Sequence, residues 1–174
     1  MLTHREDAYK LLIALGAPDR LMRHAELVSE VADQLIAVFQ SLGVGLNFGL
    51  IELGAILHDA GKIQHPSELR EPGSLHEQAG QTLLLANGVQ PEIARCCVSH
   101  GAWQLPGVSL EERIVALADK LWKGKREPDL ELSIIDEIAS RLGKSRWDIF
   151  ERLDTAFENI AASGSERLQS NRRS

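Results

Sequence analysis

The chain has 174 residues, a length that predicts one domain with enough residues for a substantial hydrophobic core. Hydrophobic residues make up 44% of the chain and aromatic residues only 5%, so the core must consist mainly of aliphatic side chains, which suits helices. The formal net charge is −6 and the isoelectric point lies near 5.5. This acidity argues against a nucleic-acid polymer or an anionic membrane as a general partner.

Cysteine usage and the absence of apolar targeting segments predict a cytoplasmic protein. The two cysteines, Cys96 and Cys97, are adjacent and therefore poorly placed to bridge to each other, so we expect them to be reduced and buried. The N-terminal residues contain no apolar signal core, and no apolar run approaches the roughly 18 residues that a membrane helix needs.

The predicted elements are all helical. Thr3 and Glu6 have the spacing of a capping box, Gly16 and Gly43 end the first two helices, and Asn47 caps the third. Helices are predicted over residues 3–15, from Pro18 to Gly43, from Asn47 to about residue 59, and over residues 75–86, 91–100, 110–123, 132–142 and 145–161.

No segment alternates as a strand does, so the fold class predicted is all-α, a single domain of about seven to eight helices. Residues 66–73 and 101–107 are predicted as loops. The domain spans residues 1–162, with a candidate metal-site core over about 20–123, and residues 163–174 are predicted as a disordered tail.

Four of the six histidines and two aspartates share helical faces with the predicted core. A lone histidine on an apolar face is more often a hydrogen-bonded core residue than a ligand, whereas a buried, unpaired carboxylate is strongly disfavoured. Asp119 therefore needs Arg113, Lys120 or a metal as its partner. Several helices that each offer such a group inward together indicate a metal centre. The candidate metal ligands are His24, His58, Asp59, His76, His100 and Asp119.

The pair His58-Asp59 stands at the end of an apolar helix, where both side chains can turn toward one point although they lie about 100° apart around a helix axis. Asp59 has two oxygens and is the candidate bridge between two cations. His24, His58 and Asp119 would complete one site, and His76 and His100 the other. Mixed imidazole and carboxylate ligands suit Fe, Mn, Zn or Ni and do not suit Ca.

Basic and aromatic residues near these ligands are candidates for substrate binding. Lys62 follows the pair at the helix end; it is either a phosphate contact with a catalytic role or an ordinary solvated lysine. Trp103 either stacks on a base from a flap or is a partly buried anchor. One basic cluster could line an entrance for an anionic substrate, or be only a solvated face: Lys120, Lys123, Lys125 and Arg126.

These residues resemble the HD superfamily of metal-dependent phosphohydrolases, in which a histidine, a His-Asp pair and an aspartate follow in that order. Residues 57–63, Leu-His-Asp-Ala-Gly-Lys-Ile, are similar to a signature of the HDIG and HD-GYP branch. So are His76 with Gly80, His100 with Trp103, and Arg113 with Asp119.

The Gly-Tyr-Pro motif is missing, so the cyclic-dinucleotide specificity of HD-GYP proteins is not implied. The resemblance implies an HD-type helical bundle that hydrolyses a phosphate ester or anhydride of a nucleotide-like small molecule by metal-activated water. A similar six-ligand set occurs in small HD proteins that hydrolyse dinucleoside polyphosphates at a di-iron centre, which favours two divalent transition metal ions here.

Two other functions stay open at this point. Some HD proteins with two irons are oxygenases, and the ligand set does not separate that chemistry from hydrolysis. A metal-binding sensor or structural domain without catalysis is the second alternative, although a structural site is usually coordinatively closed. The helices after Arg126 carry no chemical motif, and we expect them to serve packing or a homodimer interface.

Overall fold

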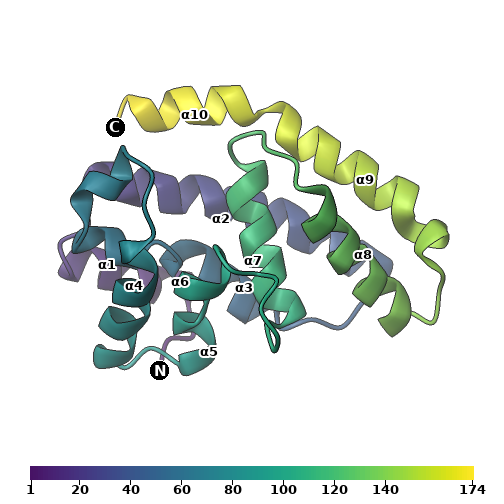
Figure 1. Cartoon of the computed structure of the whole chain (residues 1–174), viewed down its shortest axis with the longest axis horizontal. Coiled ribbons are helices and arrows are strands. Elements are labelled where there is room, and N and C mark those ends of the chain that lie inside the picture. Colours follow the sequence, from purple (N-terminus) through teal and green to yellow (C-terminus); the bar gives the residue numbers. More distant parts are fainter.

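The computed structural model describes residues 1–174 as an all-α fold without strands (Figure 1). Eight helices have nine or more residues: α1 (Arg5–Ala14), α2 (Asp19–Leu42), α3 (Phe48–Leu57), α4 (Leu75–Ala86), α7 (Leu110–Leu121), α8 (Pro128–Arg141), α9 (Arg146–Ala162) and α10 (Gly164–Arg172). Single turns complete the chain: α5 (Pro91–Ala94), α6 (Cys96–Ser99) and the 3-10 turns η1 (Ala60–Ile63) and η2 (Pro66–Leu69). The predicted fold class and helix number are confirmed.

Local signals in the sequence explain most helix ends. Gly43 ends α2 with φ = 74°, a left-handed conformation that favours glycine. The side chain of Asn47 accepts a hydrogen bond from the Leu50 N–H and so caps α3, as predicted. The predicted capping box of Thr3 is not formed, because α1 begins after His4 and has no side-chain cap.

Two predicted helices have different bounds in the structure. The helix predicted to begin at residue 132 begins at Pro128, because proline at the first helical position needs no N–H partner and presets φ. The helix predicted over residues 91–100 is two single turns, α5 and α6, that meet at Arg95.

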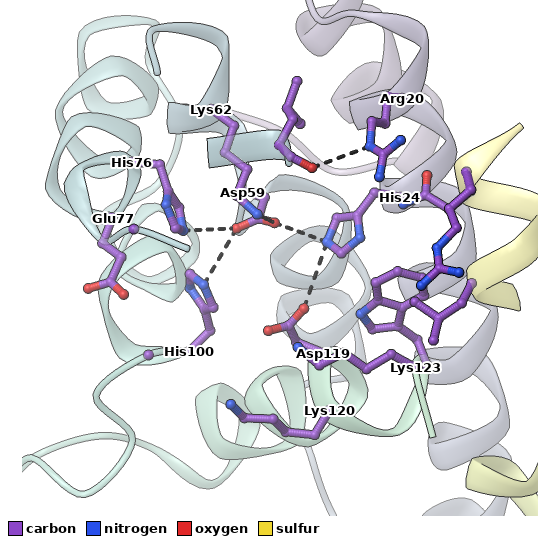
Figure 2. A pocket seen from close by; sticks show the side chains of 17 residues that line it. Arg20, His24, Asp59, Lys62, His76, Glu77, His100, Asp119, Lys120 and Lys123 are labelled. Atoms are coloured by element: carbon purple, nitrogen blue, oxygen red, sulfur yellow. Dashed lines mark hydrogen bonds and ion pairs between the residues drawn. The ribbon is translucent and has the colours of Figure 1, made fainter. Parts of the chain in front are cut away.

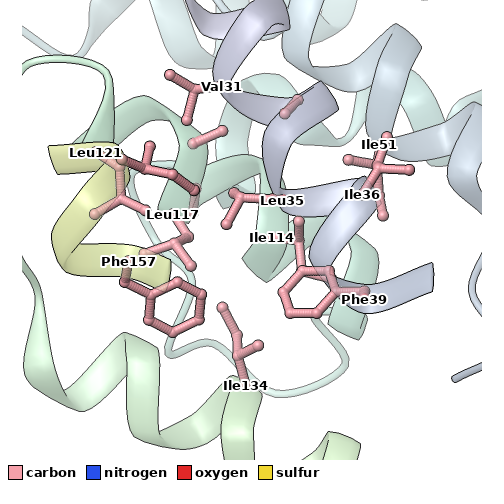
Figure 3. Close-up of a cluster of buried hydrophobic side chains, with 14 of the residues drawn as sticks. Val31, Leu35, Ile36, Phe39, Ile51, Ile114, Leu117, Leu121, Ile134 and Phe157 are labelled. Carbon is pink, nitrogen blue, oxygen red and sulfur yellow. The ribbon is translucent and has the colours of Figure 1, made fainter. Parts of the chain in front are cut away.

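The hydrophobic core consists of two main clusters that share α2 and α3. The larger cluster joins the apolar faces of α2, α7, α8 and α9 and includes Leu35, Leu117 and Phe157, all fully buried (Figure 3). The smaller cluster joins α1, α3, α4 and α5 and includes Leu57 and Leu84. The C-terminal end of α3 therefore lies where the two clusters meet, and His58-Asp59 follows it.

A close approach of two glycines fixes the chain just after this pair. A Cβ atom on Gly61 would overlap the backbone carbonyl of His76, and one on Gly80 would lie 2.9 Å from the Gly61 nitrogen. Only glycine at both positions allows η1 to lie directly against α4. The two glycines therefore set the distance between Asp59 and the helix that carries His76.

The C-terminal residues differ from the prediction of a disordered tail over 163–174. The structure continues there as α10, and Figure 1 shows this helix running above α2. Arg23 on α2 donates from Nε and Nη2 to Ser170 Oγ at 3.0 and 2.7 Å. The sequence of α10 has no apolar stripe and therefore gave no helical signal, because polar side chains hold much of this helix against α2.

No helix in the structure is both long enough and apolar enough to cross a membrane.

Candidate metal centre

The structure brings all six predicted ligands together in one buried cluster (Figure 2). They come from α2, the end of α3, the start of α4, the end of α6 and the end of α7. His58 is fully buried, Asp59 is 3% exposed, and the Asp119 side chain is 14% exposed. Because these groups are nearly shielded from water, each must be satisfied inside the cluster.

Oxygen Oδ2 of Asp59 faces the group formed by His24, His58 and Asp119. His24 Nε2 lies 3.0 Å from this oxygen, and His58 Nε2 lies 3.7 Å from it. Asp119 Oδ1 is 3.3 Å from His58 Nε2 and 3.7 Å from His24 Nε2. Arg113, a possible partner of Asp119 by sequence, pairs with Glu137 instead.

Oxygen Oδ1 of Asp59 faces the other two histidines. His76 Nε2 lies 3.2 Å from Oδ1, and His100 Nε2 lies 3.5 Å from it. The carboxylate of Asp59 therefore stands between two groups of imidazole nitrogens, one on each oxygen. This arrangement is the one expected of a carboxylate that bridges two cations.

Hydrogen bonds on the far side of three rings fix which nitrogen faces the cluster. His58 Nδ1 donates to the Ala55 carbonyl at 2.8 Å, and His100 Nδ1 donates to the Cys96 carbonyl at 3.0 Å. His76 Nδ1 donates to Glu68 Oε2 at 2.5 Å. In the neutral form of each ring, Nδ1 therefore carries the proton and Nε2 keeps a free lone pair, which is what a metal requires.

Glu68, which the sequence analysis missed, orients a residue of the cluster through this bond to His76. Its carboxylate also accepts the backbone N–H groups of Leu75 and His76, at 3.1 and 3.0 Å. His76 lowers the pKa of Glu68 against the opposing effect of burial. Glu68 lies on η2, outside any helical face, so only the P-x-E spacing after Pro66 and before α4 could have suggested it.

The carboxylates hold the cluster in a state suited to cations. Burial alone would raise the pKa of Asp59 and of Asp119, but the surrounding imidazoles outweigh burial and lower both values. Burial would lower the pKa of His58, yet Asp59 and Asp119 raise it. Both aspartates are therefore ionised at neutral pH, which is the form that coordinates a metal.

The pKa of His100 is shifted in the opposite direction to the pKa values of His58 and His76. Burial, together with the nearby His58, lowers the pKa of His100 to about 4. The pKa of His76 is raised, because Asp59 and Glu68 outweigh the burial that would lower it. His100 is therefore neutral across the physiological range and can accept a metal without losing a proton.

Two buried atoms at the centre of the cluster have no hydrogen-bond partner in the protein. They are Asp59 Oδ1 and His76 Nε2, one from each of two facing ligands. Three groups of residues each offer ligand atoms that lie within 4.8 Å of one another inside the group. They are His24–His58–Asp59, His58–His100–Asp119 and Asp59–His76–His100. The unpartnered atoms and the mixed N/O donors fit a transition metal, so the residues present suit the predicted cofactor.

Five of the six residues of the cluster, all except the fully buried His58, form the floor of a cavity of about 400 Å³. Lys62 lines it, and its Nζ lies 2.7 Å from Asp59 Oδ2. Lys120 and Lys123 also line it, as predicted for the entrance, and Figure 2 shows both near Asp119. Arg20, which the sequence analysis did not single out, lines the cavity and donates to the Leu69 carbonyl.

Other residues of the predicted substrate site lie elsewhere. Trp103 does not line the cavity and packs against the larger core cluster, the alternative of a partly buried anchor. Trp122 lines the cavity instead, and its indole meets the His24 ring edge-on with centroids 4.8 Å apart. Arg126 is engaged by Glu131, Asp154 and Glu158, and Lys125 lies near Glu127, so the basic cluster is divided.

The structure is thus an all-α protein with a buried cluster of histidines and aspartates that could hold metal ions. The HD domain family matches residues 19–123, which contain all six ligands, and the chain belongs to this family. HD domains are typically metal-dependent phosphohydrolases.

Two distant relatives were found. An uncharacterized protein of Methanocaldococcus jannaschii is 29% identical over 147 residues, which cover 75% of this chain and 82% of the relative. A tRNA (cytidine(56)-2'-O)-methyltransferase of Thermoplasma volcanium is 27% identical over 156 residues, which cover 77% of this chain and 43% of the relative. The match thus involves less than half of the methyltransferase. No solved structure matches the chain.

Proposed function

We propose that the protein is a metal-dependent phosphohydrolase that cleaves a phosphate ester or anhydride of a nucleotide-like small molecule. The observation that carries this proposal is the position of Asp59, whose two oxygens face separate pairs of histidines at the floor of an open cavity. A purely structural metal site would be closed by its ligands. Access from a cavity supports a catalytic one.

The residues of the cluster have different roles at the proposed metal centre. His24, His58 and Asp119 would hold one cation, His76 and His100 the other, and Asp59 would bridge them. When bound, such cations lower the pKa of a coordinated water and neutralise charge on a phosphoryl group. Asp59 keeps the two binding positions together, while Glu68 orients His76 through its Nδ1–H.

The lining of the cavity supports a phosphorylated substrate. Its volume of about 400 Å³ lies in the usual range of small-molecule sites. Three carboxylates line it, two of which are proposed metal ligands. The cationic side chains are more numerous, and the five that line the cavity are Arg20, Lys62, Lys120, Lys123 and Arg172. Lys62 is the cation nearest the cluster, and we propose that it contacts the reacting phosphoryl group from its place beside Asp59.

Within the HD domain family, we propose that the chain is closest to the HDIG-like branch. The two motif glycines, Gly61 and Gly80, have a physical role, because each permits the contact between η1 and α4. Without the Gly-Tyr-Pro motif, a cyclic dinucleotide is not the expected substrate.

A phosphate-release screen with Mn or Fe(II) tests the proposal. Nucleotides, dinucleoside polyphosphates and cyclic dinucleotides are offered to protein with added metal and to protein stripped by a chelator. We expect release from at least one class, only with metal present, and its loss in His58→Ala. His4→Ala, which removes an exposed imidazole at the start of α1, is the matched control.

The same screen separates the alternatives. No phosphate release from any class, together with metal-dependent oxygen consumption, would replace the hydrolase by an oxygenase. No turnover of either kind, with bound metal that stabilises the fold, would assign a sensor or structural role.

A further inference from the structure

The helix α10 is attached to the rest of the domain beside the candidate metal centre. Arg167 donates from Nη1 to the carbonyls of Leu121, Trp122 and Ile160, at 3.4, 3.4 and 2.8 Å, and so joins α10 to the end of α7. The backbones of Gly124 and Gly164 approach so closely that a Cβ atom on Gly164 would overlap Gly124. Together with the hydrogen bonds from Arg23 to Ser170, these contacts fix α10 against α2 and against the end of α7.

The attached helix contributes one wall of the cavity. Leu168, Asn171 and Arg172 all line it, although they lie outside the residues matched by the HD domain family. Leu168 also packs against the larger core cluster, which orients this face of α10 inward. This wall therefore comes from residues that lie outside the matched HD domain.

Asn171 has an unsatisfied polar atom in this wall. The residue is only 8% exposed, yet its side-chain oxygen has no hydrogen-bond partner in the protein. A buried amide oxygen without a donor costs free energy, and such an atom in a cavity wall points to a ligand that supplies the donor. An ionised phosphate oxygen cannot serve, because it only accepts hydrogen bonds, whereas a hydroxyl or amino group can donate one.

The cations next to this wall form no ion pair with a carboxylate of the protein. Lys123 follows the end of α7, Arg172 ends α10, and both are exposed residues that line the same cavity. Of the five cations around the cavity, Lys62 is the one that pairs with a carboxylate, Asp59. The α7–α10 side thus provides positive charge apart from the proposed centre of reaction.

We propose that the ends of α7 and α10 form a second anionic subsite, in which Lys123 and Arg172 bind a further phosphoryl group of the substrate. Asn171 accepts a hydrogen bond from a hydroxyl or amino group beside that phosphate. The substrate class is therefore a polyphosphorylated, hydroxyl-bearing molecule rather than a simple monophosphate. The inference rests on the proposed function, since the first phosphoryl group is the one at the metal centre.

Binding of inorganic phosphates to the Mn-loaded protein tests the charged part of the subsite. Tripolyphosphate spans both positions, whereas orthophosphate needs only the metal centre. Replacing Arg172 by Gln should weaken tripolyphosphate binding about ten-fold, because a charge-assisted contact is lost, and should leave orthophosphate binding unchanged. Arg173→Gln removes the neighbouring exposed guanidinium, which does not line the cavity, and should change neither affinity.

Calorimetry gives both affinities without turnover, so the subsite and the proposed function can fail separately. Equal effects of Arg172→Gln and Arg173→Gln, or an equal loss of both probes in Arg172→Gln, would overturn the subsite. Dependence on Arg172 in a protein that releases no phosphate would support the subsite and overturn the hydrolase. Metal-dependent phosphate release from a nucleoside diphosphate or triphosphate that is indifferent to Arg172 would do the reverse.

The role of Asn171 has its own comparison. ADP carries sugar hydroxyls and pyrophosphate carries none, so Asn171→Ala should weaken ADP binding about five-fold and leave pyrophosphate binding unchanged. A loss that is the same for both probes would assign Asn171 to packing and contradict the proposed hydrogen bond. Thermal unfolding of the variant shows whether α10 remains docked during the measurement.

Discussion

The two sides of the Asp59 carboxylate are built by different means. His24 and Asp119 lie on α2 and α7, whose apolar faces form the larger core cluster, so helix packing positions them. His76 lies in the first turn of α4 and His100 follows the single turn α6, and hydrogen bonds to Glu68 and to the Cys96 carbonyl orient their rings. One side depends on many apolar contacts and the other on a few polar ones.

The two proposed metal positions should therefore respond to different substitutions. A packed side resists local changes but is lost when the core is weakened. A side held by hydrogen bonds can lose its metal while the fold remains intact. Asp59 belongs to both sides, so replacing it should weaken metal binding at both positions.

Removing the charge of Asp59 should have the largest effect. In Asp59→Asn, phosphate release by the metal-supplemented protein should fall about 1000-fold or more, because several kcal/mol of charge stabilisation depend on the bound cations. Metal analysis should find fewer ions on both sides. Asp129→Asn, an exposed change in the first turn of α8, is the control. Retention of two bound ions in Asp59→Asn would show that this residue is no bridge.

Weakening the larger core cluster should affect the packed side. Leu117 is fully buried on α7, two residues before Asp119, and Leu117→Ala should lower the free energy of unfolding by about 2–5 kcal/mol. Chemical denaturation measures this loss. The ion held by His24, His58 and Asp119 should be released at lower denaturant than the other. Simultaneous release of both ions would argue that the sides are not independent.

Neutralising Glu68 should affect the hydrogen-bonded side alone. Glu68→Gln should weaken one metal site about 10-fold to 100-fold, the usual range for a residue that orients a ligand, and leave the other unchanged. The metal-free protein should keep its thermal stability within a few degrees. Glu71→Gln, an exposed change nearby, serves as the comparison. An unchanged affinity at both sites would leave Glu68 with no role beyond capping α4.

Proton release on metal binding should distinguish the histidines more finely. The pKa values of His58 and His76 are raised above 6.5, so each is more than half protonated at pH 6.5 in the metal-free protein. His100, with its pKa lowered to about 4, has no proton to release there. Binding should therefore release more than one proton in total at pH 6.5, and metal affinity should fall as the pH falls.

Calorimetry in buffers of different ionisation enthalpy counts these protons. A count near zero would contradict the raised pKa values of His58 and His76. A count near four, one proton for every histidine of the cluster, would contradict the lowered pKa of His100.

Most of the candidate ligands could be located from the sequence because they share a helical face with apolar residues. His24 follows Leu21 and precedes Val28 on α2, and all three lie on one buried face. A 3.6-residue period is a local property, so the sequence reveals which face turns inward.

Contacts between distant segments could not be predicted in this way. Glu68 reaches the start of α4 from a 3-10 turn, and no periodicity marks that contact. The helix α10 is polar and is docked by Arg23 and Arg167 rather than by an apolar stripe, so its sequence resembled a tail. The choice of Trp103 over Trp122 had the same cause, because the cavity depends on how α7 meets α10.

The carboxylate of Glu68 has a consequence for measurements of amide hydrogen exchange. It holds the backbone N–H groups of Leu75 and His76 and the ring of His76 at the same time. Opening of the first turn of α4 must therefore break the bond that orients a metal ligand. The exchange rates of these two amides should slow when metal binds, which makes them a spectroscopic reporter of occupancy that needs no substrate.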